Sequence, residues 1–398
     1  MTWFRWHDDA QIFAASGQSV ARSDTGGGMI ADQPAGMALA RALAIPGAAF
    51  RIAGSDLGSN APLPAEGLFE TLTSGTLGAP RRIVRSQASW TASFAINAAL
   101  FNIGPGTRVA VLGRLQHSLA LYGALEAVHL GAALHLLDDL RPVAQRAALA
   151  ARHIHILYAT PAQLRLLIRT GGVNWPELRL ILLGGSKLDA PLRADLSAIT
   201  KAQIREFYGA AEASFITMAN SDAPQTSVGA PYPGVQVQVR TGADVLADGK
   251  IGEIWVRSPY LFLGYAGKDA GAAVIDHGWL SVGEMGWFDA GYLYLAGRAG
   301  RMVTVADQNV FPEAIEAFLA GLPGVHQVAV LPRTDAQRGV QMVALIKGDR
   351  AQNAAILAAG RLQFGPLKAP RALIWCDDWP CLASGKPDLV ALARRVKQ

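Results

Sequence analysis

The sequence has few cysteines and few charged residues. Only Cys376 and Cys381 occur in 398 residues, which is too few for a disulfide framework, and no cluster has zinc-ligand spacing. Charged residues make up 17% of the chain and hydrophobic residues 51%. This composition excludes a disordered chain, because such chains are polar and rich in charge. So little cysteine suits a reducing compartment, and we expect a cytoplasmic protein.

The sequence also lacks a long uninterrupted apolar run. Its most apolar stretch, residues 119–137, contains Glu126, His129 and His135, whereas a membrane-spanning helix needs about 20 mostly uncharged residues. The stretch therefore predicts a buried helix followed by a buried strand, and we expect no membrane span. The polar first residues do not resemble a signal peptide.

No basic tract and no dinucleotide fingerprint is present. The net charge is +5, but the basic residues are scattered, so the chain does not have the pattern of a nucleic-acid-binding protein. A modest positive charge suits an acidic substrate or partner. The absence of Gly-x-Gly-x-x-Gly after a strand argues against a nucleotide-dependent oxidoreductase.

The expected pattern of secondary structure changes twice along the chain. Between about residues 68 and 230, β-branched apolar runs alternate with helical stretches, which predicts a mainly parallel sheet covered by helices. The strands are expected at residues 108–112, 154–158 and 178–183, and the helices at 89–102, 119–129, 143–152 and 161–169. Short alternating strands at about residues 228–297 indicate a β-rich subdomain. We expect an α/β protein whose large N-terminal domain, residues 1–297, precedes a small α+β domain, residues 302–398.

Residues 71–81, TLTSGTLGAPR, have the composition of a phosphate-binding loop. Glycines let the backbone approach an anion closely, hydroxyl and amide groups donate to its oxygens, and an arginine adds charge. The run lacks the Gly-Lys-Ser/Thr of nucleoside-triphosphatase P-loops. The alternative is an ordinary Ser/Thr/Gly turn.

The same loop resembles the T-S-G-T-T-G-x-P-K signature of the acyl-adenylate-forming (AMP-binding) superfamily, which includes acyl-CoA synthetases, aryl-acid ligases and adenylation domains. Further resemblances follow in the family's order. They are the runs LGGSKL at 183–188, FYGAAE at 207–212, GAPYPG at 229–234, GWLSVGEMG at 278–286 with GYL at 291–293 and GR at 297–298, NVFPEAIE at 309–316, and PCLASGK at 380–386. The segment before the loop is shorter than is usual in the family.

The resemblance implies an ATP-dependent carboxylic acid ligase. Such an enzyme activates an aryl or fatty acid as acyl-AMP, releases pyrophosphate, and passes the acyl group to a phosphopantetheine thiol of CoA or of an acidic acyl carrier protein. ATP, Mg²⁺ and that thiol are then the expected co-substrates. The family fold has a large domain, a hinge, here residues 298–301, and a small mobile C-terminal domain.

The resemblance also implies roles for individual residues. Lys386 would bridge the acid and the α-phosphate, Glu212 would hold Mg²⁺, and Arg298 would contact ribose or phosphate. The nucleotide would be bound by Thr73, Ser74, Gly75, Thr76, Gly78, Arg81, Gly184, Gly185, Tyr208, Gly209 and Glu284, and the acid pocket would include His117, Lys187 and Ala210. Read without the family, Glu212 is a surface carboxylate, Tyr208 a core side chain and Lys386 a solvated tail lysine. In the same way His117 has a structural role, Arg298 forms a linker ion pair and Lys187 faces solvent.

The sequence departs from the family pattern at several positions. The threonine before the metal carboxylate is Ala211, the ribose aspartate is Glu284, and the Gly-Gly turn along the pantetheine tunnel is Ala306-Asp307. These changes motivate an alternative, a degenerate relative that binds nucleotide or acyl-adenylate without full ligase activity. Retention of Lys386 favours the enzyme.

Overall fold

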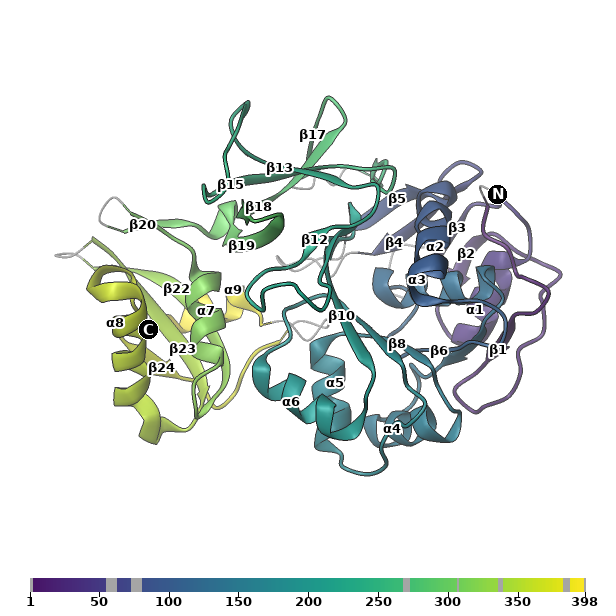
Figure 1. Cartoon of the computed structure of the whole chain (residues 1–398), viewed down its shortest axis with the longest axis horizontal. Helices are drawn as coiled ribbons and strands as arrows, with labels where there is room; N and C mark the ends of the chain where they lie inside the picture. The colour runs from purple at the N-terminus through teal and green to yellow at the C-terminus, as the bar shows by residue number, and fades with distance from the viewer. Residues whose placement is uncertain are drawn as a thin grey trace. The chain divides into compact units, whose positions relative to one another are not determined.

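The computed structural model describes residues 3–54, 63–72, 81–267, 273–305, 308–335, 339–381 and 387–396. These residues form two compact units (Figure 1). The first unit contains the described residues up to 72, residues 81–237 and residues 256–280, and the second contains residues 238–255 and the described residues from 281 onward. Each unit has its own hydrophobic core.

An eight-stranded sheet forms the centre of the first unit. Its strands, in spatial order, are β1 (Gln11–Phe13), β7 (Ala133–Leu136), β6 (Arg108–Val111), β8 (Ile156–Ala159), β9 (Leu180–Leu183), β10 (Gln203–Ala210), β11 (Ser214–Met218) and β12 (Ala230–Pro231). The strands from β1 to β10 are parallel, and β11 and β12 are antiparallel. The carboxyl ends of the parallel strands therefore share one edge of the sheet, where open α/β sheets bind ligands.

Helices cover both faces of this sheet (Figure 1). The helices α2 (Gln87–Phe101) and α3 (Ser118–His129) lie on one face, and α4 (Pro142–Ala151), α5 (Pro161–Arg169) and α6 (Ala190–Ile199) lie on the other. Leu149, Leu164 and Leu192 of the second set share one buried cluster with Leu157 and Ile181 of the sheet. The predicted parallel sheet with helices on both faces is confirmed, as is the buried helix and strand within residues 119–137.

A second, five-stranded sheet lies in the same unit. Its order is β16 (Gly264–Tyr265), β5 (Arg82–Ser86), β4 (Leu68–Leu72), β3 (Phe50–Ala53) and β2 (Gly28–Ala31), and α1 (Ala35–Leu43) contacts β2 and β3. Phe69 of β4 packs edge-on against Trp90 of α2 with ring centroids 4.7 Å apart, and Trp90 packs against Tyr122 of α3 at 5.1 Å. These rings connect the five-stranded sheet to the helices of the larger sheet.

Short strands fill residues 236–298. They are β13 (Gln236–Thr241), β14 (Asp244–Val245), β15 (Gly252–Arg257), β17 (Val274–Asp276), β18 (Trp279–Asp289) and β19 (Tyr292–Arg298). The strands β18 and β19 form an antiparallel hairpin in which Glu284 lies opposite Arg298.

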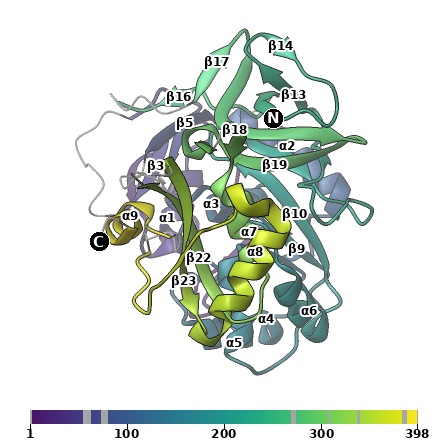
Figure 2. The same cartoon turned by 90° about the vertical axis from the view of Figure 1, so that its left-hand side faces the viewer.

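The rest of the second unit is a small α+β fold. After a 3₁₀ turn (Ala299–Arg301) come the paired strands β20 (Val303–Val305) and β21 (Gln308–Val310), the helix α7 (Pro312–Ala320), the sheet β22 (Val325–Asp335), β23 (Gly339–Gly348) and β24 (Leu373–Trp375), a 3₁₀ turn (Arg350–Gln352), and the helices α8 (Asn353–Lys368) and α9 (Leu389–Val396). Figure 2 shows α7 and α8 on one side of β22 and β23, and α9 on the other. Successive residues of β22 point to opposite sides of this sheet. Val330 belongs to the hydrophobic cluster under α7 and α8, and Ala329 to the cluster under α9.

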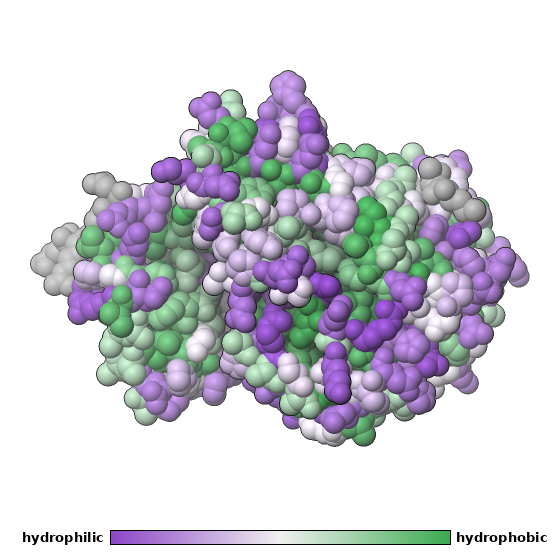
Figure 3. Space-filling model, in the orientation of Figure 1, coloured by the Kyte–Doolittle hydropathy of each residue, from purple (hydrophilic) through white to green (hydrophobic). Residues whose placement is uncertain are grey.

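The surface is mixed in character. On the face drawn in Figure 3, hydrophilic and hydrophobic residues are interspersed. None of the helices in the described ranges is long and apolar enough to cross a bilayer.

Candidate active site

In the first unit, the predicted site residues follow the carboxyl ends of parallel strands. Gly184 and Gly185 come directly after β9, Tyr208 to Ala210 end β10, and Glu212 lies two residues beyond β10. His117 lies after β6 and is the N-cap residue of α3. The sheet topology therefore brings these residues from separate parts of the chain to one edge of the sheet.

Glu212 is half-buried and held by a residue that the sequence reasoning missed. The hydroxyl of Tyr265 donates a hydrogen bond to its Oε1 atom over 2.8 Å. The guanidinium of Arg81, at the end of the predicted phosphate loop, lies 6.0 Å from the centroid of the Tyr265 ring. Burial raises the pKa of Tyr265, and the neighbouring Glu212 raises it further, so its hydroxyl stays a donor at neutral pH. Tyr265 thus lies between Arg81 and the carboxylate of Glu212, which is the candidate Mg²⁺ ligand.

A fully buried arginine, Arg85, supports the backbone near Glu212. Its guanidinium donates to the backbone oxygen of Ala211 and to that of Tyr260, and the backbone nitrogen of Phe262 donates to the oxygen of Glu212 over 2.7 Å. Burial lowers the pKa of Arg85 to about 9, while Glu212 acts in the opposite direction. Arg85 therefore remains charged at neutral pH and joins the backbone at Ala211, next to Glu212, to the backbone at Tyr260.

Glycines are sterically required at two of the predicted positions. A Cβ atom on Gly184 would lie 2.3 Å from the Phe207 ring, and one on Gly209 would lie 2.2 Å from the backbone oxygen of Ser214. The pairing of β10 with β11 shifts register between Tyr208 and Gly209. This bulge directs the Tyr208–Glu212 segment away from regular strand geometry.

His117 lies beside the start of the predicted phosphate loop. It forms a β-bridge with Leu72, within the described start of the loop, and Thr71 Oγ1 lies 2.9 Å from Ser118 Oγ. Burial lowers the pKa of His117, and Arg114 lowers it further, against a smaller opposite effect of Asp32. The imidazole is therefore neutral at physiological pH.

Lys187 is exposed, but its ammonium group has a backbone partner. Its Nζ atom donates to the backbone oxygen of Ser227, and burial lowers its pKa. The contact anchors the Gly184–Lys187 turn to the loop that precedes β12.

In the second unit, Glu284 and Arg298 form an ion pair. Arg298 NH2 lies 2.8 Å from Glu284 Oε1, and Arg298 keeps 44% of its side chain exposed. Nearby in sequence, Arg301 in the predicted hinge pairs with Glu316 at 2.7 Å and with Glu313 at 3.2 Å. The hinge segment is thus tied to α7.

Several predicted residues lie outside the described residues. They are Thr73, Ser74, Gly75, Thr76 and Gly78 of the phosphate loop, Ala306 and Asp307, and Lys386. Their roles stay predictions from the sequence.

Glu212 is the described residue that best fits a metal ion. In the described ranges, no group of three or more His, Cys, Asp or Glu side chains could hold a metal ion by itself. Glu212 is a single carboxylate, which suits Mg²⁺ arriving with a nucleotide, because Mg²⁺ is typically bound by one or two carboxylates together with substrate phosphates. The residues therefore fit a Mg²⁺–nucleotide substrate.

Protein-family comparisons agree with the geometry. A family model described as AMP-binding enzyme matches residues 50–266, and one described as AMP-binding enzyme C-terminal domain matches residues 314–386. An uncharacterised acyl–CoA ligase, YhfT, of Bacillus subtilis (strain 168) is 30% identical over 329 residues, which cover 81% of this chain and 67% of the relative. A 3-hydroxybenzoate–CoA ligase of Aromatoleum sp. (strain CIB) is 26% identical over 358 residues, which cover 86% and 68%.

Solved structures share the fold. MatB from Rhodopseudomonas palustris, solved with ATP bound, has a TM-score of 0.74 at 23% identity, over 93% of this chain and 79% of that one. The o-succinylbenzoate CoA synthetase of Bacillus subtilis, solved with its acyl-adenylate, has a TM-score of 0.73 at 22% identity, over 81% and 68%.

Proposed function

The chain belongs to the AMP-binding enzyme family, and on that premise we propose that it is an ATP-dependent acid–thiol ligase. In the first step a carboxylate oxygen of the acid attacks the α-phosphorus of ATP. The bond from that phosphorus to the bridging oxygen breaks, and pyrophosphate leaves with the electron pair. In the second step a thiolate attacks the acyl carbonyl carbon of the acyl-AMP, and AMP leaves as the thioester forms.

The observation that carries the proposal is the anchored carboxylate at the end of β10. The Tyr265 hydroxyl donates to the Glu212 carboxylate over 2.8 Å, and Arg85 donates to the backbone oxygen of the preceding residue, Ala211. Two anions must meet in the first step, so the site needs cations and oriented donors. Glu212 would hold Mg²⁺, and the ion would supply charge neutralisation at the phosphates when bound.

Other residues complete the proposed site. Arg81 would contact the outer phosphates, Tyr208 would stack on adenine, and Glu284 would accept hydrogen bonds from the ribose hydroxyls. The Glu284–Arg298 ion pair orients that carboxylate. Lys386 would bridge the acid and the α-phosphate. The acid would lie near His117 and Ala210.

We propose an acid with an aryl or fatty body. Several relatives are named for such acids: one is a 3-hydroxybenzoate–CoA ligase, one an indoleacetate–CoA ligase and one a long-chain-fatty-acid–CoA ligase. The neutral His117 adds no positive charge beside the acid, which suits an uncharged body.

Pyrophosphate release tests the first step. The protein is incubated with ATP, Mg²⁺ and a panel of aryl and fatty acids, and acyl-AMP is identified by mass spectrometry. Release that depends on one acid class supports the ligase. Absence of release with every acid would favour the degenerate binder.

The thiol acceptor is tested separately. The relatives' names support CoA, and the chain's net charge of +5 also suits an acidic carrier protein. CoA and a phosphopantetheinylated acyl carrier protein are added in parallel reactions, and thioester formation is measured. The acceptor that consumes acyl-AMP at the higher kcat/KM is the substrate.

A further inference from the structure

A cavity of about 510 Å³ lies at the β1 edge of the eight-stranded sheet. Gly106 and Gly131, which precede β6 and β7, line it, so it lies toward the amino ends of these strands. The proposed active site is at their carboxyl ends. The volume is in the range of small-molecule sites, about 300–1,000 Å³, and nothing in the proposed ligase reaction uses it.

His135 of β7 is the unusual residue in this cavity. It is only 6% exposed, and neither of its two buried ring nitrogens has a hydrogen-bond partner among the described residues. Its ring stacks on Phe13 of β1, with centroids 4.7 Å apart and planes 9° apart. Buried polar groups are normally hydrogen-bonded, so an imidazole without a partner in the wall of this cavity is unusual.

Arg152, which follows α4, supplies positive charge at the cavity wall. Its guanidinium donates to the backbone oxygen of Ala14 over 3.1 Å and to that of Ala15. Across the described ranges, Arg152 forms an ion pair with no carboxylate. Its position is thus fixed by backbone contacts while its charge is not neutralised by a neighbouring carboxylate.

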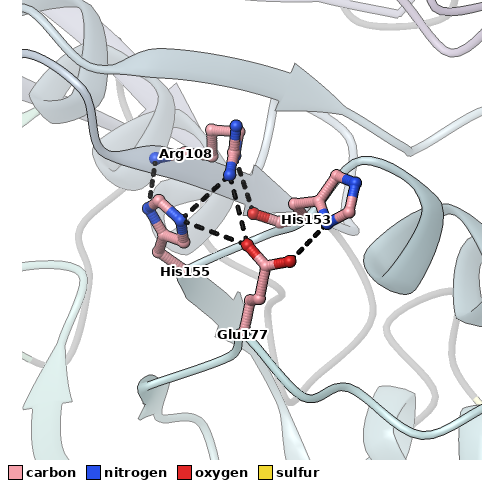
Figure 4. Close-up of polar contacts among 4 residues, drawn as sticks. All are labelled: Arg108, His153, His155 and Glu177. Atoms are coloured by element: carbon pink, nitrogen blue, oxygen red, sulfur yellow. Dashed lines mark hydrogen bonds and ion pairs between the residues drawn. The ribbon is translucent and has the colours of Figure 1, made fainter.

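Arg108 of β6 lines the cavity as well, and the cluster in Figure 4 fixes it. Arg108 Nε donates to the backbone oxygen of His153 over 2.8 Å. Arg108 NH2 lies 3.3 Å from Glu177 Oε2 and 3.2 Å from His155 Nε2. The one carboxylate among the cavity-lining residues described, Asp9, is 63% exposed and pairs with His7.

The electrostatics agree with this geometry. Burial, together with smaller contributions from Arg152 and Arg108, lowers the pKa of His135 to about 4. The imidazole is therefore neutral at physiological pH. The uncompensated positive charge beside the cavity belongs to Arg152, because Glu177 offsets the charge of Arg108.

We propose that this cavity is a second ligand site, which binds a small organic or inorganic oxyanion through Arg152 and Arg108, with the His135 ring in its wall. Guanidinium groups match the planar oxygens of carboxylates and the oxygens of phosphates. The stacked rings of Phe13 and His135 form a wall of the cavity beside the arginines. Carboxylate and phosphate share this chemistry, and the probes below separate them.

Histidine NMR tests the site without relying on ligase activity. Protein labelled with ¹⁵N-histidine is titrated, in the absence of ATP, with inorganic phosphate, benzoate or AMP, and the His135 imidazole signals are followed. We expect a saturable shift with at least one probe. Phosphate identifies a bare phosphate site, benzoate a carboxylate site, and AMP alone a nucleotide site.

Matched variants locate the binding. Arg152→Met removes the charge, and Ala133→Leu fills the cavity from the half-buried strand position that lines it. We expect each to weaken binding at least tenfold. Arg141→Met, at the exposed N-cap of α4, the helix that Arg152 follows, should bind like the wild type.

The proposal is overturned if no probe gives a saturable His135 shift, or if Ala133→Leu binds with wild-type affinity. Because ATP is absent, either failure is independent of the ligase proposal.

Discussion

The Tyr265 hydroxyl donates to Glu212 Oε1 over 2.8 Å, although 53 residues separate them in the chain. The contact depends on β16 pairing with β5, where Tyr265 lies opposite Ile83. That pairing places a neutral donor on the carboxylate proposed to hold Mg²⁺.

Removal of this donor should weaken Mg²⁺ use. A hydrogen bond to a charged group contributes about 1.5 kcal/mol, so we expect Tyr265→Phe to raise the half-saturating Mg²⁺ concentration roughly tenfold. The measurement is pyrophosphate release against Mg²⁺ at saturating acid. The control is Tyr294→Phe, whose ring stacks on Trp287. An unchanged Mg²⁺ dependence in Tyr265→Phe would mean that this contact does not position the metal carboxylate.

Removal of the buried cation should destabilise the first unit. Arg85→Met leaves the Ala211 and Tyr260 oxygens without this donor, and each unsatisfied buried acceptor costs about 1–3 kcal/mol. We expect a loss of about 3 kcal/mol in the free energy of unfolding, measured with urea. Arg169→Met, at the exposed end of α5, should change stability by less than about 0.5 kcal/mol. Equal stability of the two variants would contradict the structural role of Arg85.

A buried carboxyl group should make stability depend on pH. Glu126 on α3 accepts from Asn97 Nδ2 over 2.8 Å and from the Tyr158 hydroxyl, and burial raises its pKa from 4.5 to about 7. The folded protein then holds a proton that the unfolded chain has released between these values. Glu126 therefore contributes stability that is fully present below pH 4.5 and is lost as pH rises through 7.

The experiment compares Glu126→Gln with the wild type. The wild-type free energy of unfolding minus that of the variant should fall by about 3 kcal/mol between pH 4.5 and 8. His129 and His135, whose pKa values burial lowers to about 4, titrate with the opposite sign, but both proteins contain them and the difference removes their effect. Glu66→Gln, at an exposed position, serves as the control. A difference that is constant with pH would refute the prediction.

Lys386 should be needed for the first chemical step. We expect Lys386→Ala to slow acyl-AMP formation on the order of a hundredfold, as does loss of other groups that stabilise developing charge. Lys250→Ala, an exposed lysine of the same unit, should retain wild-type rates. Rapid-quench measurement of acyl-AMP separates this step from thioester formation. Retention of full activity by Lys386→Ala would remove that lysine from the mechanism.

The sequence predicted the central elements closely, because hydrophobic period and turn residues are local. The strand expected at 108–112 is β6 (Arg108–Val111), and the helix expected at 119–129 is α3 (Ser118–His129). The helix α8 (Asn353–Lys368) has a kink at Gly365, where φ is +74°. The strand β1 could not be predicted from the sequence, because three residues are too few to show an alternating pattern. It forms only by pairing with β7, about 120 residues away.

The sequence by itself determined the family, the α/β class and the order of the motifs around Glu212, since these depend on residue identities along short runs. Only the tertiary structure decided which side chains support that carboxylate. Tyr265 and Arg85 belong to no motif, and strand pairing brings them to Glu212 from distant segments. The oxyanion cavity has the same origin, because Arg152, Arg108 and His135 come from three elements that adjoin only when the sheet forms. Hydrogen bonds and ion pairs of this kind depend on distances between remote residues, which local patterns do not encode.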